Sequence, residues 1–334
     1  MKSILITGGA GYIGSQTALE ILDNTDWSVV VFDKAELNSI LAKSYSTFGS
    51  RIKFIYGNLL NNLDLDNLFS NTKIDGIIHF AASIEVGESQ INPALYYENN
   101  VIGSFNLINK AYLNGVKKIV FSSTAAVYGV PESVPILETS RINPINTYGY
   151  TKLVIEQMLR DFGRSYQLDS ICLRYFNACG ADKDSRTGEN HNPETHLIPS
   201  ILQSIGTNRI FKIFGNDYNT QDGTCVRDYI HTSDLASAHI LALKKLLEND
   251  GVVKSINLGT GSGYSNQQVF ETVEKITGQK VNMEIASRRD GDPDKLIADN
   301  NLAKSYLGWN PINSNLDNII QTAWNWEGVK KSIK

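Results

Sequence analysis

Tyr148 and Lys152 lie four residues apart, at the start of a stretch with helical character that continues from Leu153 to Phe162. Residues at this spacing share one face of a helix, so we expect the two side chains to point the same way. A buried ammonium group stabilises a nearby phenolate and lowers the pKa of the tyrosine from its usual value of about 10. Such a tyrosine can act as a general acid or base. The spacing is common by chance, so it indicates chemistry only in the company of other motifs.

A second motif, a glycine-rich turn, lies near the N-terminus. Gly8, Gly11 and Gly14 follow a short apolar run and open a helical stretch. Glycines at this spacing let backbone N–H groups approach a pyrophosphate, and the positive end of the helix adds favourable charge. Asp33 ends the next apolar run, 19 residues beyond Gly14, where an acid accepts hydrogen bonds from ribose hydroxyls and repels a 2′-phosphate. The pattern predicts a dinucleotide site that prefers NAD to NADP.

The elements that must position these residues alternate along the first half of the chain. Apolar runs at 3–7, 29–32, 53–56, 76–80, 118–121 and 170–174 predict strands, with helical stretches between them such as 93–113. This alternation predicts an α/β fold with a doubly wound parallel (Rossmann) sheet. After Phe176 the alternation of strand and helix signals becomes irregular. This change predicts a cofactor domain over 1–178 and a smaller C-terminal substrate-binding lobe over 179–334. Residues 234–248 read as a helix that Asp234 could cap, and 255–258 as a strand, so the chain is expected to recross to the first domain around 230–260.

Composition narrows the possible partners. The 334 residues carry a net charge of −4, which gives no basic field for nucleic acid or an acidic membrane. No apolar stretch approaches the roughly 18 residues of a membrane span, and no signal-peptide core is evident. The three scattered cysteines favour a reducing compartment, so we expect a cytoplasmic protein. The five histidines lack the sequence spacing of a metal site, so no metal is expected.

Longer segments carry a resemblance to a known family. The glycine turn, the Tyr-x-x-x-Lys pair and Ser122 to Gly129 resemble the extended short-chain dehydrogenase/reductases. The resemblance is closer still to the UDP-glucose 4-epimerases and runs nearly end to end. Its segments include 79–82, 86–89, 99–101, 173–177, 213–218, 222–231, 257–259, 289–292 and 307–309.

The resemblance implies a role for each matching residue. It makes Tyr148, Lys152 and Thr124 catalytic: Tyr148 takes the proton of the sugar 4-hydroxyl, Lys152 holds the nicotinamide ribose, and Thr124 bonds the 4-oxygen. The residues that it and the glycine motif assign to the cofactor, NAD, are Gly8, Gly11, Tyr12, Ile13, Gly14, Asp33, Asn58, Leu59, Phe80, Ala81, Ala82, Asn99, Ser122, Tyr148, Lys152 and Tyr175. Those assigned to the substrate are Thr124, Tyr148, Asn177, His196, Leu197, Arg227, Arg289 and Asp292, with the two arginines on the diphosphate.

Several positions depart from the family pattern. Asn58 stands where an aspartate is usual near the adenine, and Ile84 where some members have a lysine. His196 replaces an asparagine that commonly precedes the position of Leu197. Leu296 lies where sugar size is thought to be selected, and leucine is intermediate between the residues that exclude and admit an N-acetyl group.

The reaction that the resemblance implies is a reversible, NAD-dependent 4-epimerisation of UDP-glucose and UDP-galactose through a 4-keto sugar. A 4-epimerase of N-acetylated UDP-hexoses or UDP-uronates remains an alternative. A 4,6-dehydratase needs an acid and a base beside the threonine, where this chain has Ala125 and Ala126. A non-catalytic NAD-binding regulator is less consistent with the retained Tyr148 and Lys152. The family also implies a homodimer built from helices, including 93–113 and 148–162.

Overall fold

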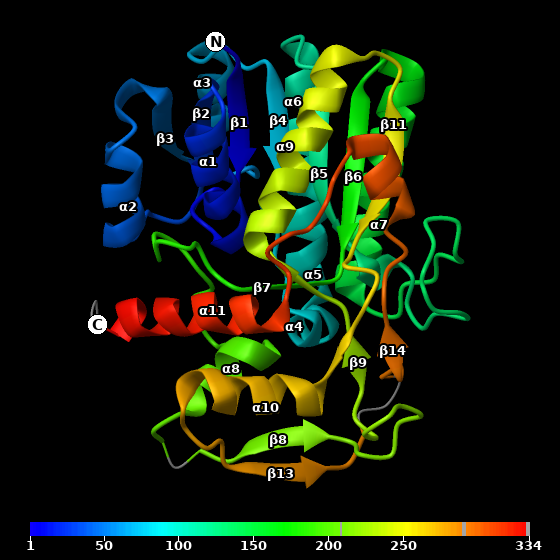
Figure 1. Cartoon of the computed structure of the whole chain (residues 1–334). Coiled ribbons are helices and arrows are strands. Elements are labelled where there is room, and N and C mark those ends of the chain that lie inside the picture. Colours follow the sequence, from blue (N-terminus) through cyan, green and yellow to red (C-terminus); the bar gives the residue numbers. More distant parts are fainter. Residues whose placement is uncertain (208, 289–291, 332–334) are drawn as a thin grey trace.

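The computed structural model describes residues 1–207, 209–288 and 292–331. Its larger part is built on a seven-stranded parallel sheet in the order β11-β6-β5-β4-β1-β2-β3 (Figure 1). The strands are β1 (Ser3–Thr7), β2 (Ser28–Asp33), β3 (Ile52–Tyr56), β4 (Gly76–His79), β5 (Lys118–Thr124), β6 (Asp169–Tyr175) and β11 (Val253–Leu258). The first strand, β1, lies in the middle of this sheet. Strands β2 and β3 are added on one side of it and β4, β5, β6 and β11 on the other, so the strand order reverses between β1 and β4. This is the switch point where doubly wound folds bind ligands.

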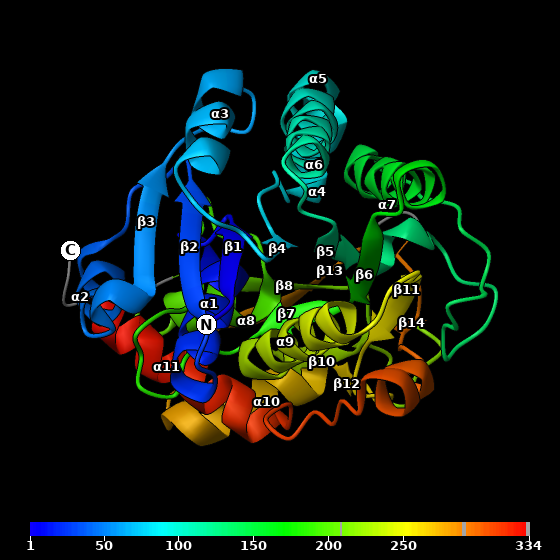
Figure 2. The same ribbon diagram turned by 90° about the horizontal axis from the view of Figure 1, so that it is seen from above.

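Helices cover both faces of the sheet (Figure 2). On one face α1 (Tyr12–Asn24) packs against α9 (Thr232–Glu248), and α2 (Ser39–Ser46) lies beside them. The other face carries α3 (Asn62–Ser70), α6 (Gly103–Leu113) and α7 (Thr147–Tyr166). Because both faces are covered, the central strands need no polar alternation, and Ile4, Leu5 and Ile6 are all fully buried.

Short helical segments complete this layer. They are η1 (Gly49–Arg51), α4 (Val86–Ile91), α5 (Pro93–Tyr96), η2 (Tyr97–Ile102) and η3 (Ala125–Val127). The helix predicted over 93–113 is confirmed as the continuous path of α5, η2 and α6, in which η2 is a π-helical stretch. All six strands predicted in the first half are also confirmed, each to within a few residues at its ends.

The smaller lobe lies beyond the carboxyl ends of the sheet strands (Figure 1). It contains α8 (Leu197–Ser204), α10 (Asn266–Thr277), α11 (Leu316–Lys331) and the paired strands β8 (Phe211–Phe214) and β13 (Met283–Ala286). Two further small sheets join it to the larger part: β7 (Asn177–Cys179) with β10 (Tyr229–His231), and β9 (Val226–Arg227) between β12 (Tyr264–Ser265) and β14 (Lys295–Leu296). The lobe has its own apolar core, in which Ile201, Phe270 and Ile320 pack together.

The chain returns to the larger part after entering the lobe. Helix α9 packs on α1 and the sheet, β11 extends the sheet beyond β6, and η4 (Ala303–Leu307) packs on both. We therefore propose that residues 1–178 form the cofactor domain together with α9, β11 and η4, and that the rest of 179–334 forms the substrate lobe.

The expected cap of α9 is wrong. The helix begins at Thr232 and His231 is its N-cap, with the imidazole accepting a hydrogen bond from the Ser233 N–H. Asp234 instead lies buried in the first turn, where its carboxylate accepts hydrogen bonds from the backbone N–H groups of Ile312 and Asn313. This acid therefore fixes the segment that leads to α11, a contact that sequence periodicity does not reveal.

Among the described residues, none of the helices is both long and apolar enough to cross a membrane.

Candidate active site

Helix α7 positions Tyr148 and Lys152. Asn146 caps its N-terminus by accepting a hydrogen bond from the Gly149 N–H at 2.8 Å, so Tyr148 lies in the first turn and Lys152 one turn later. The Lys152 Nζ is 5.8 Å from the centroid of the Tyr148 ring, and only 1% of the residue is exposed. It donates a hydrogen bond of 2.8 Å to the carbonyl oxygen of Ser122. The two residues share the helix face that the sequence predicts.

The electrostatics of the pair differ from the sequence expectation. Burial raises the pKa of Tyr148 to about 12, and a hydrogen bond with Thr124 only partly opposes this. Burial also lowers the pKa of Lys152 to about 7, because a cation loses its hydration there. With burial dominant, the pKa of Tyr148 therefore lies above its usual value even with Lys152 nearby. Positive charge beside the phenol, from a protonated Lys152 or from a bound cation, would stabilise the phenolate.

The ends of β5 and β6 supply the neighbouring hydroxyl groups. Thr124 and Tyr175 are register partners at the carboxyl ends of these strands. The Ser122 and Tyr175 hydroxyls hydrogen-bond each other, while the Ser122 carbonyl accepts from Lys152. Because the carboxyl ends of parallel strands meet at one edge of the sheet, residues distant in sequence come together here with Tyr148.

The glycine turn lies at the same edge, between β1 and α1. Gly8 has a positive φ of 75°, and a Cβ on it would lie 2.7 Å from the backbone nitrogen of Ala81. A Cβ on Gly14 would overlap the carbonyl oxygen of Gly8. The first turn of α1 begins at Gly11 without a side-chain cap or an acidic residue. The helix N-terminus is thus left for an anion, as a pyrophosphate site requires.

Polar side chains continue from this turn along the sheet edge. The Asp33 carboxylate accepts hydrogen bonds from the backbone N–H groups of Ala10 and Ala35, each at 2.9 Å, so it is held directly beside the glycine turn. Asn99 accepts a hydrogen bond from Lys34 at 2.8 Å, and Asn58 folds back to accept from the Leu60 N–H. The remaining candidate contacts, Tyr12, Ile13, Leu59, Phe80 and Ala82, lie in or next to these same loops. The donor and acceptor set fits a dinucleotide with two ribose groups.

Two of the candidate diphosphate and ribose contacts meet in the lobe. Arg227 forms an ion pair with Asp292 and donates to the carbonyl oxygens of Val226 and Pro293 at 2.8 and 3.0 Å. Asp292 also accepts a hydrogen bond from the Tyr218 hydroxyl at 3.1 Å. The Arg227 side chain is 11% exposed, so its guanidinium is held in place by these bonds. Arg289, the other candidate arginine, lies outside the described residues.

Asn177 and Leu296 connect the lobe with the sheet edge. Asn177 begins β7 and donates from its side chain to the carbonyl oxygen of Asp228 at 3.1 Å. Leu296 is the register partner of Arg227, and like Ala125 and Phe176 it packs against the small buried cluster of Val127, Tyr128 and Ile136. The position suspected of selecting sugar size therefore lies between the candidate diphosphate anchor and the Thr124 region.

Sequence spacing missed one grouping of side chains. His196 is the N-cap of α8, immediately before Leu197, and its Nδ1 lies 2.7 Å from Glu189 and 3.2 Å from Glu194. His191 joins the same group. The expectation of no metal rested on histidine and cysteine spacing alone, whereas here two glutamates supply half of the possible ligands. The alternation of Glu and His over 189–196 was the available signal.

Comparison with known proteins decides the family. A family model described as the NAD dependent epimerase/dehydratase family matches residues 4–259. This chain belongs to that family. It places a glycine turn and a Tyr-x-x-x-Lys pair at one edge of its parallel sheet.

Individual members of the epimerase/dehydratase family match nearly the whole chain. A UDP-glucose 4-epimerase of Halalkalibacterium halodurans is 48% identical over 325 residues, which are 97% of this chain and 95% of that protein. The crystal structure of UDP-glucose 4-epimerase from Bifidobacterium longum in complex with NAD⁺ and UDP is 34% identical, with a TM-score of 0.92 and full coverage of both chains. The UDP-Glc/GlcNAc 4-epimerase of Campylobacter jejuni is 40% identical, with a TM-score of 0.86, over 98% of this chain and 100% of that one.

Proposed function

We propose that this chain is an NAD-dependent epimerase that interconverts UDP-glucose and UDP-galactose at C4 of the hexose. The observation that carries the proposal is the meeting of Tyr148, Lys152 and Thr124 at the sheet edge that also holds the glycine turn. Relatives named UDP-glucose 4-epimerase match 97% of the chain at up to 48% identity, which supports this choice within the family.

The catalytic roles follow from the chemistry of these side chains. Tyr148 removes the proton of the 4-hydroxyl group and later returns it to the 4-keto oxygen. The Thr124 hydroxyl donates a hydrogen bond to the sugar 4-oxygen or to the phenolate, and so keeps these two oxygens positioned for proton transfer. Lys152 supplies positive charge under the phenol and hydrogen bonds to the cofactor ribose. NAD, which the glycine turn and Asp33 would hold, would supply reversible hydride transfer at C4 of the sugar, so that no external redox partner would be consumed.

Asp33 determines the preferred form of the cofactor. Its carboxylate is fixed beside the glycine turn by two backbone N–H groups, so it cannot easily withdraw from a 2′-phosphate. In this position it accepts hydrogen bonds from the adenosine ribose hydroxyls of NAD and repels the 2′-phosphate of NADP.

Gly14→Ala tests the glycine turn. The new methyl group would overlap the Gly8 carbonyl oxygen, which is backbone and cannot rotate away. We expect the amount of NAD bound per purified subunit to fall at least tenfold. The turn must open to make room for the methyl group, and its backbone N–H groups then no longer point toward one pyrophosphate. Bound NAD is measured after denaturation by enzymatic cycling. Gly87→Ala is the matched control, since a Cβ there meets nothing within 4 Å. Full NAD content in Gly14→Ala would contradict the assignment.

Arg227 and Asp292 form the proposed anchor for UDP. In this arrangement Arg227 moves from Asp292 to the diphosphate, which frees the carboxylate for the uridine ribose. Only the nucleotide is then held tightly, so the 4-keto sugar can turn over between the two hydride transfers.

Arg227→Ala is expected to raise the KM for UDP-galactose about 10- to 100-fold, the value of one or two charge-assisted hydrogen bonds. The kcat should change less, because the reacting C4 lies at the other end of the substrate. Steady-state kinetics with both constants resolved measures this split. Arg141→Ala removes an exposed arginine paired with Glu132 and serves as the control. An unchanged KM would remove Arg227 from the anchor.

A second substrate class has an observation in its favour. Leu296 lies between Arg227 and the Thr124 region, and leucine leaves an intermediate space. The Campylobacter jejuni relative is named for both UDP-Glc and UDP-GlcNAc. The deciding experiment incubates the enzyme separately with UDP-galactose and UDP-GalNAc, without added cofactor, and separates the products by chromatography. Conversion of UDP-galactose to UDP-glucose supports the proposal. No conversion, or a stoichiometric release of NADH, contradicts it.

The proposed assembly is a homodimer, formed by the outer faces of the helical path 93–113 (α5, η2 and α6) and of α7. Tyr97 and Ile102 in η2, Phe105 in α6 and Tyr150 in α7 are large apolar or aromatic side chains that are exposed. Because η2 and α6 both contact α7, these exposed side chains lie on neighbouring helices, as is typical of interaction sites. The three free cysteines, all buried, support the cytoplasm as the proposed compartment.

Phe105→Asp is expected to convert the dimer to a monomer, because the carboxylate would be buried against its symmetry mate. Light scattering coupled to gel filtration measures the mass. Ile312→Asp, at another exposed apolar position, controls for the added charge. A wild-type protein that runs as a monomer would contradict the proposed assembly.

A further inference from the structure

We propose that Glu189, His191, Glu194 and His196 form a structural binding site for a zinc-class divalent metal ion. Each of the four offers one ligand atom, and these atoms all lie within 4.8 Å of one another. The proposal concerns a site outside the reacting centre and does not depend on the sugar that the enzyme accepts.

The geometry of the four ligand atoms suits tetrahedral coordination. Metal–ligand bonds of about 2.1 Å place tetrahedral ligands about 3.4 Å apart. The His196 Nδ1 lies 2.7 Å from Glu189 Oε1, and the His191 Nδ1 lies 3.2 Å from the same oxygen and 3.9 Å from Glu194 Oε2. These three separations bracket the tetrahedral value, and since no two of the four atoms are more than 4.8 Å apart, the widest separation would close by about 1.4 Å or less. Two imidazoles with two carboxylates are a ligand set that zinc accepts.

An unpartnered buried oxygen points independently to a cation. Glu194 Oε1 accepts hydrogen bonds from the backbone N–H groups of Thr195 and His196. The other oxygen, Oε2, is buried and has no hydrogen-bond partner among the residues that the structure describes, and only 3% of the Glu194 side chain is exposed. Leaving a buried charged acceptor unsatisfied is costly, and polar groups in folded proteins are rarely left so. A metal ion between the two imidazoles and the two carboxylates would satisfy this oxygen.

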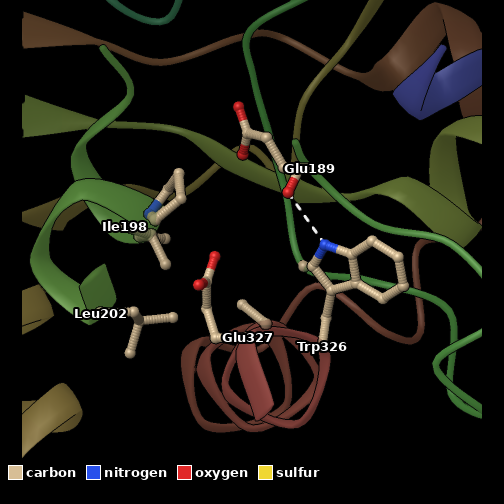
Figure 3. Close-up of a pocket in the computed structure, with 8 residues that line it drawn as sticks. Glu189, Ile198, Leu202, Trp326 and Glu327 are labelled. Carbon is tan, nitrogen blue, oxygen red and sulfur yellow. Dashed lines mark hydrogen bonds between the residues drawn. The ribbon is translucent and has the colours of Figure 1, made fainter. Parts of the chain in front are cut away.

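The protein holds the backbone of this cluster in place through separate contacts. The Trp326 indole N–H of α11 donates to the Glu189 carbonyl oxygen at 2.9 Å, as the dashed line in Figure 3 shows. This bond fixes the main chain of Glu189 and leaves its carboxylate for the histidines. Ile198, Leu202 and Glu327 line the adjoining small cavity, which holds about one water molecule and is too small for an organic ligand.

The position of the cluster indicates what a bound metal would do. The ring of Tyr12, in the glycine turn, meets His191 edge-on at 6.4 Å, and its hydroxyl donates to the carbonyl oxygen of Gly180. His196 caps α8, and both it and the following Leu197 are proposed substrate contacts. A metal here would tie the cofactor turn to the start of the substrate lobe. Four protein ligands leave no open position, so the role is structural and not catalytic.

The test measures metal binding directly, on full-length protein without a histidine tag. The protein is first dialysed against a chelator and then titrated with Zn²⁺ in competition with a chromophoric indicator. We expect one saturable Zn²⁺ per subunit, the d–d absorption bands of tetrahedral Co²⁺ on substitution, and no competition from Mg²⁺. Zinc should also raise the unfolding midpoint by about 3 °C or more, because it binds the folded state.

Two variants and a control make the outcome decisive. Glu194→Gln keeps the shape of the side chain, and His191→Ala removes one imidazole; each should abolish the stoichiometric site and the gain in midpoint. Glu271→Gln, on the exposed side of α10, should bind zinc like the wild type. Wild-type protein that binds no zinc, or variants that bind it equally, would overturn the proposal and leave the four side chains as an ion-pair cluster. Metal-free unfolding curves show whether each variant is folded.

Discussion

Tyr148→Phe is expected to lower kcat for UDP-galactose by about a thousandfold or more. The substitution removes only the phenol oxygen, which is the proposed acceptor of the 4-hydroxyl proton, and general acid–base groups contribute about 10²- to 10⁴-fold to rate. The loss should fall on kcat, with KM changed little, because the interaction is made in the transition state. Steady-state kinetics in both directions measures the effect.

The control for Tyr148→Phe is Tyr166→Phe, at the other end of α7 and exposed to solvent. Both variants should retain NAD and unfold at the wild-type temperature, since neither hydroxyl supports the backbone of the turn. A Tyr148→Phe enzyme with the wild-type kcat would exclude Tyr148 as the base and revive a non-catalytic role for the NAD fold.

Lys152→Met is expected to lower kcat at neutral pH by about a hundredfold or more and to move the acidic limb of the pH–rate profile to higher pH. Burial alone raises the pKa of Tyr148 to about 12. Positive charge beside the phenol can bring that pKa down further than the Thr124 hydrogen bond does, and Lys152 and the oxidised nicotinamide are the two proposed sources. Because the deprotonated phenol starts the reaction, activity falls as pH drops through its pKa. Removing the ammonium raises that pKa, so the limb moves upward.

The pH profile of kcat/KM separates this role from a purely structural one. Lower NAD affinity alone would be overcome by cofactor supplied in excess and would not move the limb. Lys43→Met, an exposed lysine on α2, should leave both quantities unchanged. A limb that stays in place in Lys152→Met would show that the ammonium does not tune the tyrosine.

Much of the fold could be predicted from sequence because its signals are local. The strands predicted at 3–7 and 118–121 have continuously apolar stretches at 4–6 and 119–121, as is typical of strands buried on both faces. The spacing of Gly8, Gly11 and Gly14 reflects a close approach of backbone that forbids a Cβ, which is a property of the segment itself. The prediction that Asp234 caps α9 was wrong because a non-local contact determines the position of this side chain. Asp234 is a good capping residue, but its carboxylate is committed to residues near 312, which periodicity cannot anticipate.

The sequence by itself determined that Tyr148 and Lys152 share a helix face, because the helical repeat fixes that relation, and that a dinucleotide turn precedes them. Only the tertiary structure decided the electrostatics of the pair, since burial governs both pKa values and depends on what packs around α7. It also decided that Arg227 rests on Asp292, and that two histidines and two glutamates converge beside Tyr12. Such groupings depend on how chain segments distant in sequence meet in space, which is a property of the packed fold and not of residue spacing.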